Sequence, residues 1–410
     1  MSLFEILAVV ITVTALLGFL NRRWFGLPTT IGVLAGGMAV SIALIVLGRT
    51  GVIGLSGIAG LVEQVRFDAL LMNGLLSFLL FAGSLHVDLG RLLEQRWTIL
   101  LLATLGTLAS TFLIGTATWL VTGWIGVDLP YAFALVFGAL ISPTDPVAVL
   151  SILREVRSPP ELETLVTGES LFNDGVGVVL YAITLGLVTG GTDVTPGHIA
   201  TLFVEEAIGG VLWGVALGFA AYQLLRRVDD YTVEVLITLA VVTGGYALAQ
   251  HLHVSGPLAM VVAGLFIGNH GRQFGMSETT RQHLDTYWTV TDEVLNAVLF
   301  VLIGLEVIVL DLAPGFVAAG VAAVAISLLA RFISVGVPLT LIRLRTTVRP
   351  FTIRIMTWGG LRGGIAVALA LALPAGPARD LILVMTYAVV VFSILVQGLT
   401  VETLVRRTPD

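Results

Sequence analysis

Four polar residues cluster in one apolar stretch of the sequence. The stretch 162–190 carries Glu169, Ser170, Asn173 and Asp174 among apolar neighbours. At about 100° per residue of helix, these four take bearings of about 0°, 100°, 40° and 140°, so they share one face. Two carboxyl groups on an apolar helix need a cation or a proton to balance their charge in the membrane.

A carboxyl group in this setting holds either a cation or a proton. Burial disfavours its charged form, so loss of the cation favours uptake of a proton. An acid that alternates between the two is a one-for-one cation/proton exchanger. The Ser170 hydroxyl, the Asn173 carbonyl and backbone carbonyls near Thr144 are hard oxygen ligands, which suit a small alkali cation better than a soft metal.

The alternative for both acids is a buried ion pair with an arginine that holds helices together. It applies most directly to Glu169, because Arg331 lies in another apolar segment and cannot be neutralised by losing its proton. If Arg331 pairs with Glu169, Asp174 is left as the only titrating carboxylate of the face.

Two further apolar segments contain residues that interrupt helices. Residues 142–146 read SPTDP, whose two prolines remove backbone donors, and residues 359–364 read GGLRGG. Half-helices that meet at such breaks point partial charges at each other, which Asp145 and Arg362 would offset. A simple kink with a helix-capping charge is the alternative for each.

The composition of the whole chain indicates a membrane protein. Of the 410 residues, 57% are hydrophobic and 12% are charged, and apolar runs recur along the whole length. Because lipid offers backbone groups no water to bond, such a chain crosses the bilayer as helices. The net charge of −6 argues against a nucleic-acid partner, and the lack of cysteine excludes disulfides and thiol catalysis.

Hydropathy windows of about 20 residues predict an all-α polytopic protein, a single transporter domain over residues 1–410 with thirteen transmembrane helices. The expected starts are residues 3, 28, 68, 97, 130, 162, 199, 231, 254, 290, 314, 351 and 379. With the N-terminus outside and the C-terminus in the cytoplasm, sixteen of the 21 arginines lie in cytoplasmic loops. A further span over residues 50–63 would reverse this bias, so we interpret that Gly-rich segment as an outer interfacial helix or loop.

The expected helices form two repeats. Six helices over about 3–190 match six over about 231–402, and a seventh helix at about 199–225 links the two units. The extra crossing inverts the second unit, an architecture of secondary transporters with alternating access at a midplane site. Asp145 and Arg362 then lie in equivalent broken helices, the fifth and the twelfth.

With these residues identified, the chain resembles the NhaP-type sodium/proton antiporters, members of the monovalent cation:proton antiporter family that includes the eukaryotic sodium/proton exchangers. The resemblance covers nearly all of the expected helices. Its motifs are SPTDPVAV at 142–149, GESLFNDG at 168–175, HVSGPLAMVVAGLFIGN at 253–269, NAVLFVLIGLE at 296–306 and GGLRGGIAVALAL at 359–371.

The resemblance implies an ion site and no enzymatic activity or cofactor. Asp174 would bind sodium, lithium or the proton, with Ser170 and Thr144 as further sodium ligands and Glu169 and Asn173 assisting. Asn173 stands where electrogenic relatives carry a second Asp, which implies electroneutral exchange of one cation per proton. A homodimer in the cell membrane is also implied.

The resemblance further implies a Glu169–Arg331 pair, but it leaves the partner of Arg362 open. Several relatives carry an acid near residues 81–83 that pairs with the equivalent arginine, whereas this chain has Ala82. Asp145 and helix-end carbonyls are the two alternatives for Arg362.

Three other functions are alternatives to sodium/proton exchange. Potassium/proton exchange is the alternative within transport, because these residue types do not set the size of the ion cavity. An intramembrane hydrolase is disfavoured because no expected span holds a histidine for a Ser–His dyad, and the surroundings of Asp145 and Asp174 do not match two-aspartate proteases. A buried titrating acid between broken helices makes a poor passive channel. We interpret Glu293 as a helix-end charge rather than as part of a cytoplasmic funnel.

Overall fold

The computed structural model describes residues 3–50, 67–156, 158–190, 195–310, 313–343 and 350–407. No strand occurs in these ranges, and eight of their helical segments are long and apolar enough to cross a membrane. The prediction of an all-α membrane protein is confirmed, while the number of thirteen transmembrane helices stays a prediction. The interfacial segment expected over residues 50–63 lies almost wholly outside the described residues.

Long helices make up most of the fold. They are α1 (Leu3–Leu20), α2 (Thr29–Arg49), α8 (Thr107–Ile125), α11 (Pro160–Thr189), α12 (Pro196–Leu225), α13 (Tyr231–His251), α16 (Glu278–Glu306), α17 (Pro314–Arg343) and α20 (Pro377–Phe392). Shorter helices are α4 (Phe67–Leu70), α5 (Leu76–Leu85), α6 (Leu89–Glu94), α7 (Arg96–Leu101), α14 (Gly256–Phe266), α15 (Arg272–Gly275) and α21 (Gly398–Arg406). Turns of π-helix adjoin several of these, at Asn21–Phe25, Leu71–Leu75, Leu102–Gly106, Ile267–Gly271 and Ser393–Gln397.

Every expected start except one lies within three residues of a helix start. The exception is α16, which begins at Glu278 instead of residue 290. The Ser277 hydroxyl accepts a hydrogen bond from the backbone N–H of Thr280 and caps the helix there. The first turns of α16 are too polar for a hydropathy window to detect, so an acid expected at the helix end, Glu293, lies in its middle.

Both expected breaks are present. The first separates α9 (Tyr131–Ile141) from α10 (Val147–Glu155), and the second separates α18 (Pro350–Trp358) from α19 (Gly364–Leu371). The backbone N–H of Asp145 donates to the carbonyl of Leu361 over 2.8 Å, so the two non-helical segments touch. The contact satisfies one of the backbone groups that the breaks expose inside the protein.

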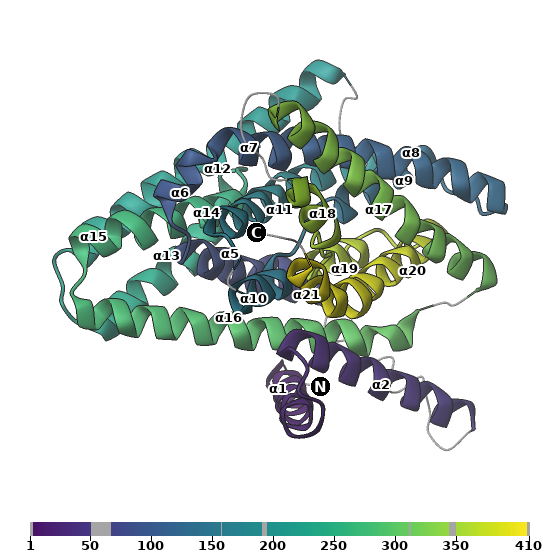
Figure 1. Cartoon of the computed structure of the whole chain (residues 1–410), viewed down its shortest axis with the longest axis horizontal. Coiled ribbons are helices and arrows are strands. Elements are labelled where there is room, and N and C mark those ends of the chain that lie inside the picture. The colour runs from purple at the N-terminus through teal and green to yellow at the C-terminus, as the bar shows by residue number, and fades with distance from the viewer. Residues whose placement is uncertain are drawn as a thin grey trace.

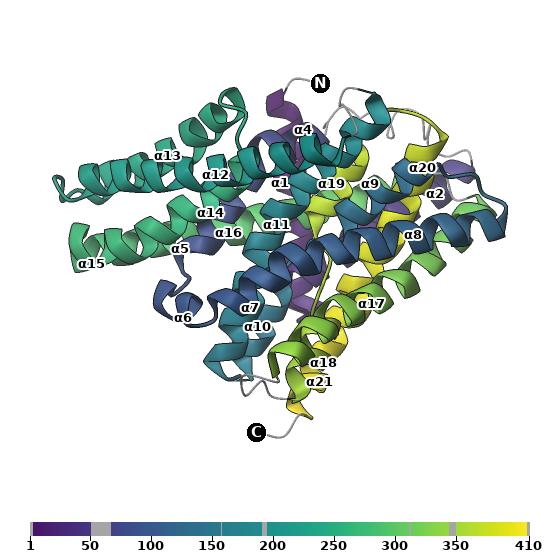
Figure 2. The same ribbon diagram turned by 90° about the horizontal axis from the view of Figure 1, so that it is seen from above.

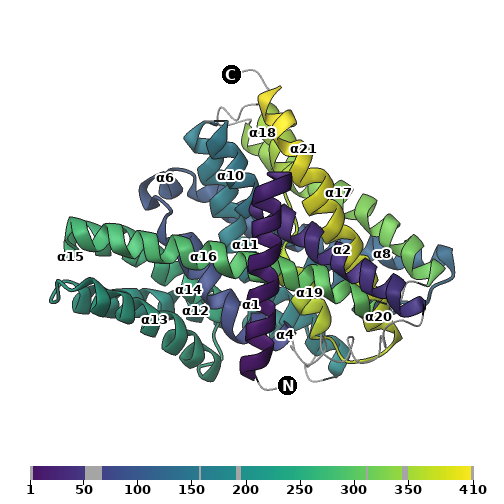
Figure 3. The same cartoon turned by 90° about the horizontal axis from the view of Figure 1, so that it is seen from below.

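The breaks lie in the interior of the molecule beside α11, which passes through its centre (Figure 1). The helix α16 crosses one side of the molecule, and α1 and α2 pack against it. The two ends of the chain lie at opposite edges, with α10, α18 and α21 near the C-terminal edge (Figures 2 and 3). The interior of the helix assembly therefore carries the polar segments, and its outside is covered by apolar helices.

Small residues let some helices approach closely. A side chain in place of Gly115 of α8 would collide with the backbone of α9, and one in place of Gly138 of α9 would collide with the backbone of α8. Such contacts are typical of helix pairs in membranes, where packing replaces the hydrophobic effect as the driving force. They fix α9, and with it the first break, against α8.

Candidate functional site

The polar face predicted on α11 points into the protein. The exposed fractions are 1% for Glu169, 2% for Ser170, 0% for Asn173 and 7% for Asp174. The first break packs against this face, because Thr144 contacts three of the four side chains. The structure thus brings together the residues that the sequence selected, from two separate elements.

Glu169 is locked in an ion pair. The two terminal nitrogens of Arg331 donate to its two carboxylate oxygens over 2.6 and 2.7 Å, and both side chains are buried. Arg331 also donates through Nε to the carbonyl of Met356 in α18 over 3.2 Å. The bidentate pair ties α11 to α17 and to the end of α18, which is the structural alternative considered for this acid.

Asn173 and Thr144 form a closed hydrogen-bond network with Glu169 and Ser170. The Asn173 amide donates to Glu169 Oε1 over 2.7 Å and to Thr144 Oγ1 over 2.9 Å, and its oxygen accepts from the Thr144 N–H over 3.2 Å. The hydroxyls of Thr144 and Ser170 are 3.1 Å apart. These side chains therefore have partners within the protein and hold the first break against α11.

Asp174 differs from its neighbours. Within the part of the chain that the structure describes, its carboxylate makes no hydrogen bond or ion pair, and it lines a cavity of about 1110 Å³. Thr144, Ser170 and Asn173 do not line this cavity. Of the four residues of the polar face, Asp174 is therefore the one that reaches the cavity.

The cavity opens toward one side of the molecule. Its rim includes Arg22 and Arg154, two exposed arginines of segments expected in the cytoplasm, and its inner end reaches Asp145 and Asp174. Among the described residues that line it, none belongs to an expected outer loop. The structure is therefore open from the arginine-rich side to Asp174.

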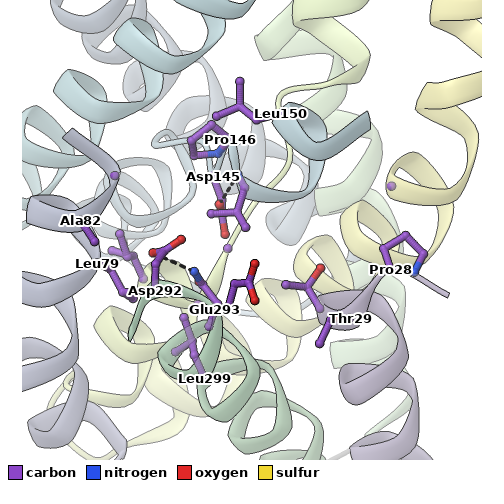
Figure 4. Close-up of a pocket in the computed structure, with 18 of the residues that line it drawn as sticks. Pro28, Thr29, Leu79, Ala82, Asp145, Pro146, Leu150, Asp292, Glu293 and Leu299 are labelled. Carbon is purple, nitrogen blue, oxygen red and sulfur yellow. Dashed lines mark hydrogen bonds between the residues drawn. The ribbon is translucent and has the colours of Figure 1, made fainter. Parts of the chain in front are cut away.

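Two acids of α16 line the cavity between its rim and its inner end. The carboxylates of Asp292 and Glu293 face Asp145 across it (Figure 4). Asp292 accepts a hydrogen bond from the amide of Asn296 over 3.1 Å. Sequence reasoning missed Asp292 and interpreted Glu293 as a helix-end charge; that interpretation was wrong, because α16 begins earlier than expected. A carboxylate four residues before the Asn of the NAVLF motif was the available signal.

Arg362 is satisfied by the backbone of the other break. Its Nη1 donates to the carbonyls of Ser142 and Pro143 over 2.5 and 2.8 Å, and its backbone N–H donates to Ser393 Oγ over 2.8 Å. These two carbonyls close α9, so a cation lies at the negative end of that helix dipole. Ala82, at the position where the resemblance implied an acid in several family members, is 1% exposed. The open choice for Arg362 is thereby resolved in favour of helix-end carbonyls.

The Asp145 carboxylate lies at the N-termini of two helices, whereas Arg362 lies at the C-terminus of one. The carboxylate accepts from the Val147 N–H at the start of α10 over 2.9 Å. It also packs against Gly363, directly before α19, where a Cβ would collide with it. A negative charge at two N-terminal helix ends is stabilising, so Asp145 offsets the positive ends of α10 and α19 while Arg362 offsets the negative end of α9.

A mixed cluster lies at the rim of the cavity. His86, just after α5, lies 3.3 Å from Arg272 Nη2 and 3.8 Å from the carboxylate of Asp285, which also pairs with Arg272. Its second ring nitrogen lies 3.4 Å from the Thr289 hydroxyl. Burial lowers the pKa of the His86 imidazole, the charges of Arg272 and Arg154 lower it further, and Asp285 opposes them.

Comparison with known proteins gives consistent matches over the whole chain. The family described as sodium/hydrogen exchanger, transmembrane, matches residues 9–407. The Na⁺/H⁺ antiporter NhaP of Pseudomonas aeruginosa is 48% identical over 410 residues, covering 99% of this chain and 97% of that protein. The Na⁺/H⁺ antiporter NhaH of Halobacillus dabanensis is 38% identical over 380 residues, covering 90% and 91%.

A solved structure has a similar fold. The sodium proton antiporter MjNhaP1 from Methanocaldococcus jannaschii, determined at pH 8, matches with a TM-score of 0.76 at 18% sequence identity. The match covers 98% of both chains. At this identity the likeness is evidence for the fold, and it includes the whole helical arrangement described above.

Proposed function

The chain belongs to the sodium/hydrogen exchanger family, and from this membership we propose that it is a multi-pass membrane antiporter that exchanges sodium ions for protons. It is a transporter and not an enzyme. The curated relatives that match it over most of their length are named Na⁺/H⁺ antiporters.

Asp174 is the residue that carries the ion or the proton. The observation behind this assignment is that Asp174 reaches the cavity without a partner among the described residues, while Glu169 is neutralised by Arg331. A buried carboxylate without a counter-charge needs a companion cation, and sodium or a proton fills that role. Ser170 and Thr144, which do not line the cavity, become sodium ligands only if the wall between them and Asp174 opens when the ion arrives.

The cycle begins on the arginine-rich side. A sodium ion enters the acid-lined cavity, displaces the proton of Asp174 and is carried as the helices around the breaks move relative to α16 and its neighbours. The reverse step exchanges sodium for a proton at the other membrane face. The crossed breaks support this cycle, because paired broken helices at matching places of two inverted repeats, about 3–190 and 231–402, are a known basis of alternating access.

We further propose that the exchange is electroneutral, with one sodium or lithium ion per proton. Asn173 is a neutral amide in a closed hydrogen-bond network, so Asp174 is left as the one titrating group of the polar face. The protein is proposed to act as a homodimer in the cell membrane, with its N-terminus outside and its C-terminus in the cytoplasm. The bias of the arginines supports this orientation.

Transport by the purified protein in liposomes tests the carrier assignment. An imposed proton gradient, followed with a pH-sensitive dye, is expected to collapse on addition of sodium or lithium. Asp174→Asn should abolish this response. The matched control is Asp88→Asn, which removes an exposed carboxylate while keeping a side-chain oxygen for the cap of α6. Full transport by Asp174→Asn would refute the assignment, and a response to potassium alone would replace sodium as the substrate.

The stoichiometry is tested by clamping the membrane potential. Moving one net charge per cycle would couple transport to about 2.3 kcal/mol per 100 mV. Sodium-driven proton movement should therefore be the same at clamped potentials of zero and of 100 mV. A systematic change of rate with potential would contradict electroneutral exchange, while leaving the role of Asp174 intact.

A further inference from the structure

A second cavity lies on the outside of the helix assembly, away from the ion site. It has a volume of about 510 Å³ and lies between α17, α18 and α21. These helices lie together near the C-terminal edge, on the arginine-rich side of the molecule (Figures 2 and 3). The cavity is lined by Phe332, Arg354, Thr357, Trp358, Thr400, Thr403, Leu404 and Arg407.

Two helices each present one continuous face to this groove. From α18 come Arg354, Thr357 and Trp358, at spacings of three and four residues. From the end of α21 come Thr400, Thr403, Leu404 and Arg407, at spacings of three, four and seven residues. Residues at these spacings lie on the same side of a helix, so the groove is a lengthwise slot between two helices and not an isolated dent.

The walls of the groove are apolar. Phe332 of α17 is 54% exposed and projects from a helix whose outer face also exposes Leu329. The Trp358 indole N–H is already used, because it donates to Thr400 Oγ1 over 2.9 Å. The Trp358 N–H is therefore not free for a ligand, and the ring adds apolar surface of a residue type that is enriched at membrane–water interfaces.

Two arginines in the same groove carry positive charge that no acid of the described residues neutralises. Among the described residues, neither Arg354 nor Arg407 forms an ion pair, whereas the adjacent Arg406 pairs with Glu402 over 2.8 Å. Thr357 also lines the groove, although its hydroxyl oxygen is buried. Two guanidinium groups beside an apolar slot are complementary to a phosphate that carries hydrocarbon.

We propose that this groove binds an anionic phospholipid of the membrane leaflet on the arginine-rich side. The lipid phosphate lies between Arg354 and Arg407, and an acyl chain follows Phe332, Trp358 and Leu404. Basic pockets between transmembrane helices at this side of a bilayer recognise such headgroups. The arginines supply charge recognition, and the slot supplies the area that distinguishes a lipid from a free anion.

Lipid bound here would act on the transport machinery, an effect that rests on the proposed function. The groove wall is α18, which ends at the second break. The carbonyl of Trp358 accepts from Gln397 Nε2 over 2.8 Å, and that of Met356 accepts from Arg331. A lipid along α18 therefore steadies the half-helix to which the Glu169–Arg331 pair is attached, and faster exchange in anionic membranes is expected.

Native mass spectrometry of the full chain tests the binding without reference to transport. With phosphatidylglycerol added in detergent, the parent protein should retain one tightly bound lipid, and with phosphatidylcholine it should retain at least tenfold less. The double variant Arg354→Gln with Arg407→Gln should lose the phosphatidylglycerol preference. The matched control is Arg406→Gln, which removes the same charge one residue away and should bind as the parent does. Equal retention by the double variant would overturn the proposal.

A variant that fills the groove and a headgroup without acyl chains together test whether the ligand is a lipid or a free anion. Leu404→Trp keeps both arginines and occupies the slot, so it should reduce bound phosphatidylglycerol at least tenfold. Glycerol 1-phosphate, which has the headgroup without chains, should leave the melting temperature of the parent unchanged, while phosphatidylglycerol should raise it. Stabilisation by glycerol 1-phosphate equal to that by the lipid, or undiminished lipid binding by Leu404→Trp, would each overturn the lipid site. Failure of transport with intact lipid binding would instead count against the proposed function.

Discussion

The two helix breaks touch each other but are built from different residue types. The first, residues 142–146, uses prolines, and its polar side chains reach both α11 and the cavity. The second, residues 359–363, uses glycines, and side chains at Gly360 and Gly363 would collide with Arg331 and Asp145. The first break contributes polar side chains to α11 and to the cavity, whereas the second leaves room for Arg331 and Asp145 and contributes Arg362.

The charged residues of the two breaks lie at different helix ends. Arg362 of the second break closes the end of α9, and Asp145 of the first break lies at the starts of α10 and α19. The end of α18 has no charge from either break and depends on Arg331, which is fixed by Glu169. The first break is therefore held by Arg362 of its counterpart as well as by α11, whereas the end of α18 is held through Arg331 and Glu169.

The largest expected effect comes from freeing Arg331. Glu169→Gln leaves a buried guanidinium without a counter-charge, and the free energy of unfolding should fall by about 3–5 kcal/mol. The double variant Glu169→Gln with Arg331→Met should recover most of that stability, because no charge is then left unpaired. Equilibrium unfolding in detergent measures both. A double variant no more stable than Glu169→Gln would show that the second break is not held through this pair.

Removing the charge of Arg362 should have the next largest effect. Arg362→Met keeps an unbranched apolar stem but removes the guanidinium, so the carbonyls of Ser142 and Pro143 lose their donor. The loss of hydrogen bonds to a charged group should reduce stability by about 2–4 kcal/mol and transport by at least tenfold. Arg379→Met, in an outer segment, serves as the control. Unchanged transport would mean that the first break is held without its counterpart.

Adding a methyl group to the second break should affect transport more than stability. In Gly363→Ala the new Cβ meets the Asp145 carboxylate, and such overpacking costs about 1–3 kcal/mol. Gly244→Ala is the control, because a Cβ there meets no atom within 4 Å. Sodium-driven proton exchange and melting temperature are measured for both. If the two variants behave alike, the second break does not need to make room for Asp145.

The cluster of His86, Arg272 and Asp285 at the rim of the cavity is partly exposed, whereas both breaks are buried. Since burial and nearby arginines lower the pKa of His86, folding favours its neutral form. Stability from this group is present above the unfolded pKa of about 6.5 and is lost as pH falls through the lower folded value. His86→Gln should therefore lose slightly less melting temperature than the parent between about pH 7 and 5. A steeper loss in the variant would contradict the direction of this pKa shift.

The sequence predicted which residues form the site better than it predicted the partners of those residues. The polar face of α11, the two breaks and the Glu169–Arg331 pair follow from helical spacing, proline and glycine chemistry and the need of a buried arginine for a counter-charge. The partner of Arg362 could not follow in the same way, because backbone carbonyls carry no side-chain signal. Helix starts were recovered because apolar runs are long, and α16 was misplaced because its first turns are polar.

The shape of the cavity was also beyond the sequence. Ser170 and Thr144 have the chemistry of sodium ligands, but only packing shows that they bond each other behind the cavity wall. Asp292 has an ordinary sequence context for a helix end, and it gains its place in the cavity from the length of α16. The inverted repeats and the ligand roles stay predictions.

The hydrogen bonds of Asn173 limit how this protein can change over evolutionary time. An Asp at this position would have no N–H groups, so Glu169 Oε1 and Thr144 Oγ1 would lose their donor and a new carboxylate would lie against an existing one. A descendant that exchanges two protons per sodium ion is therefore not expected from that single replacement. It would first have to rearrange Glu169 and Arg331, so the Asn173 amide would protect the one-for-one exchange proposed for this chain.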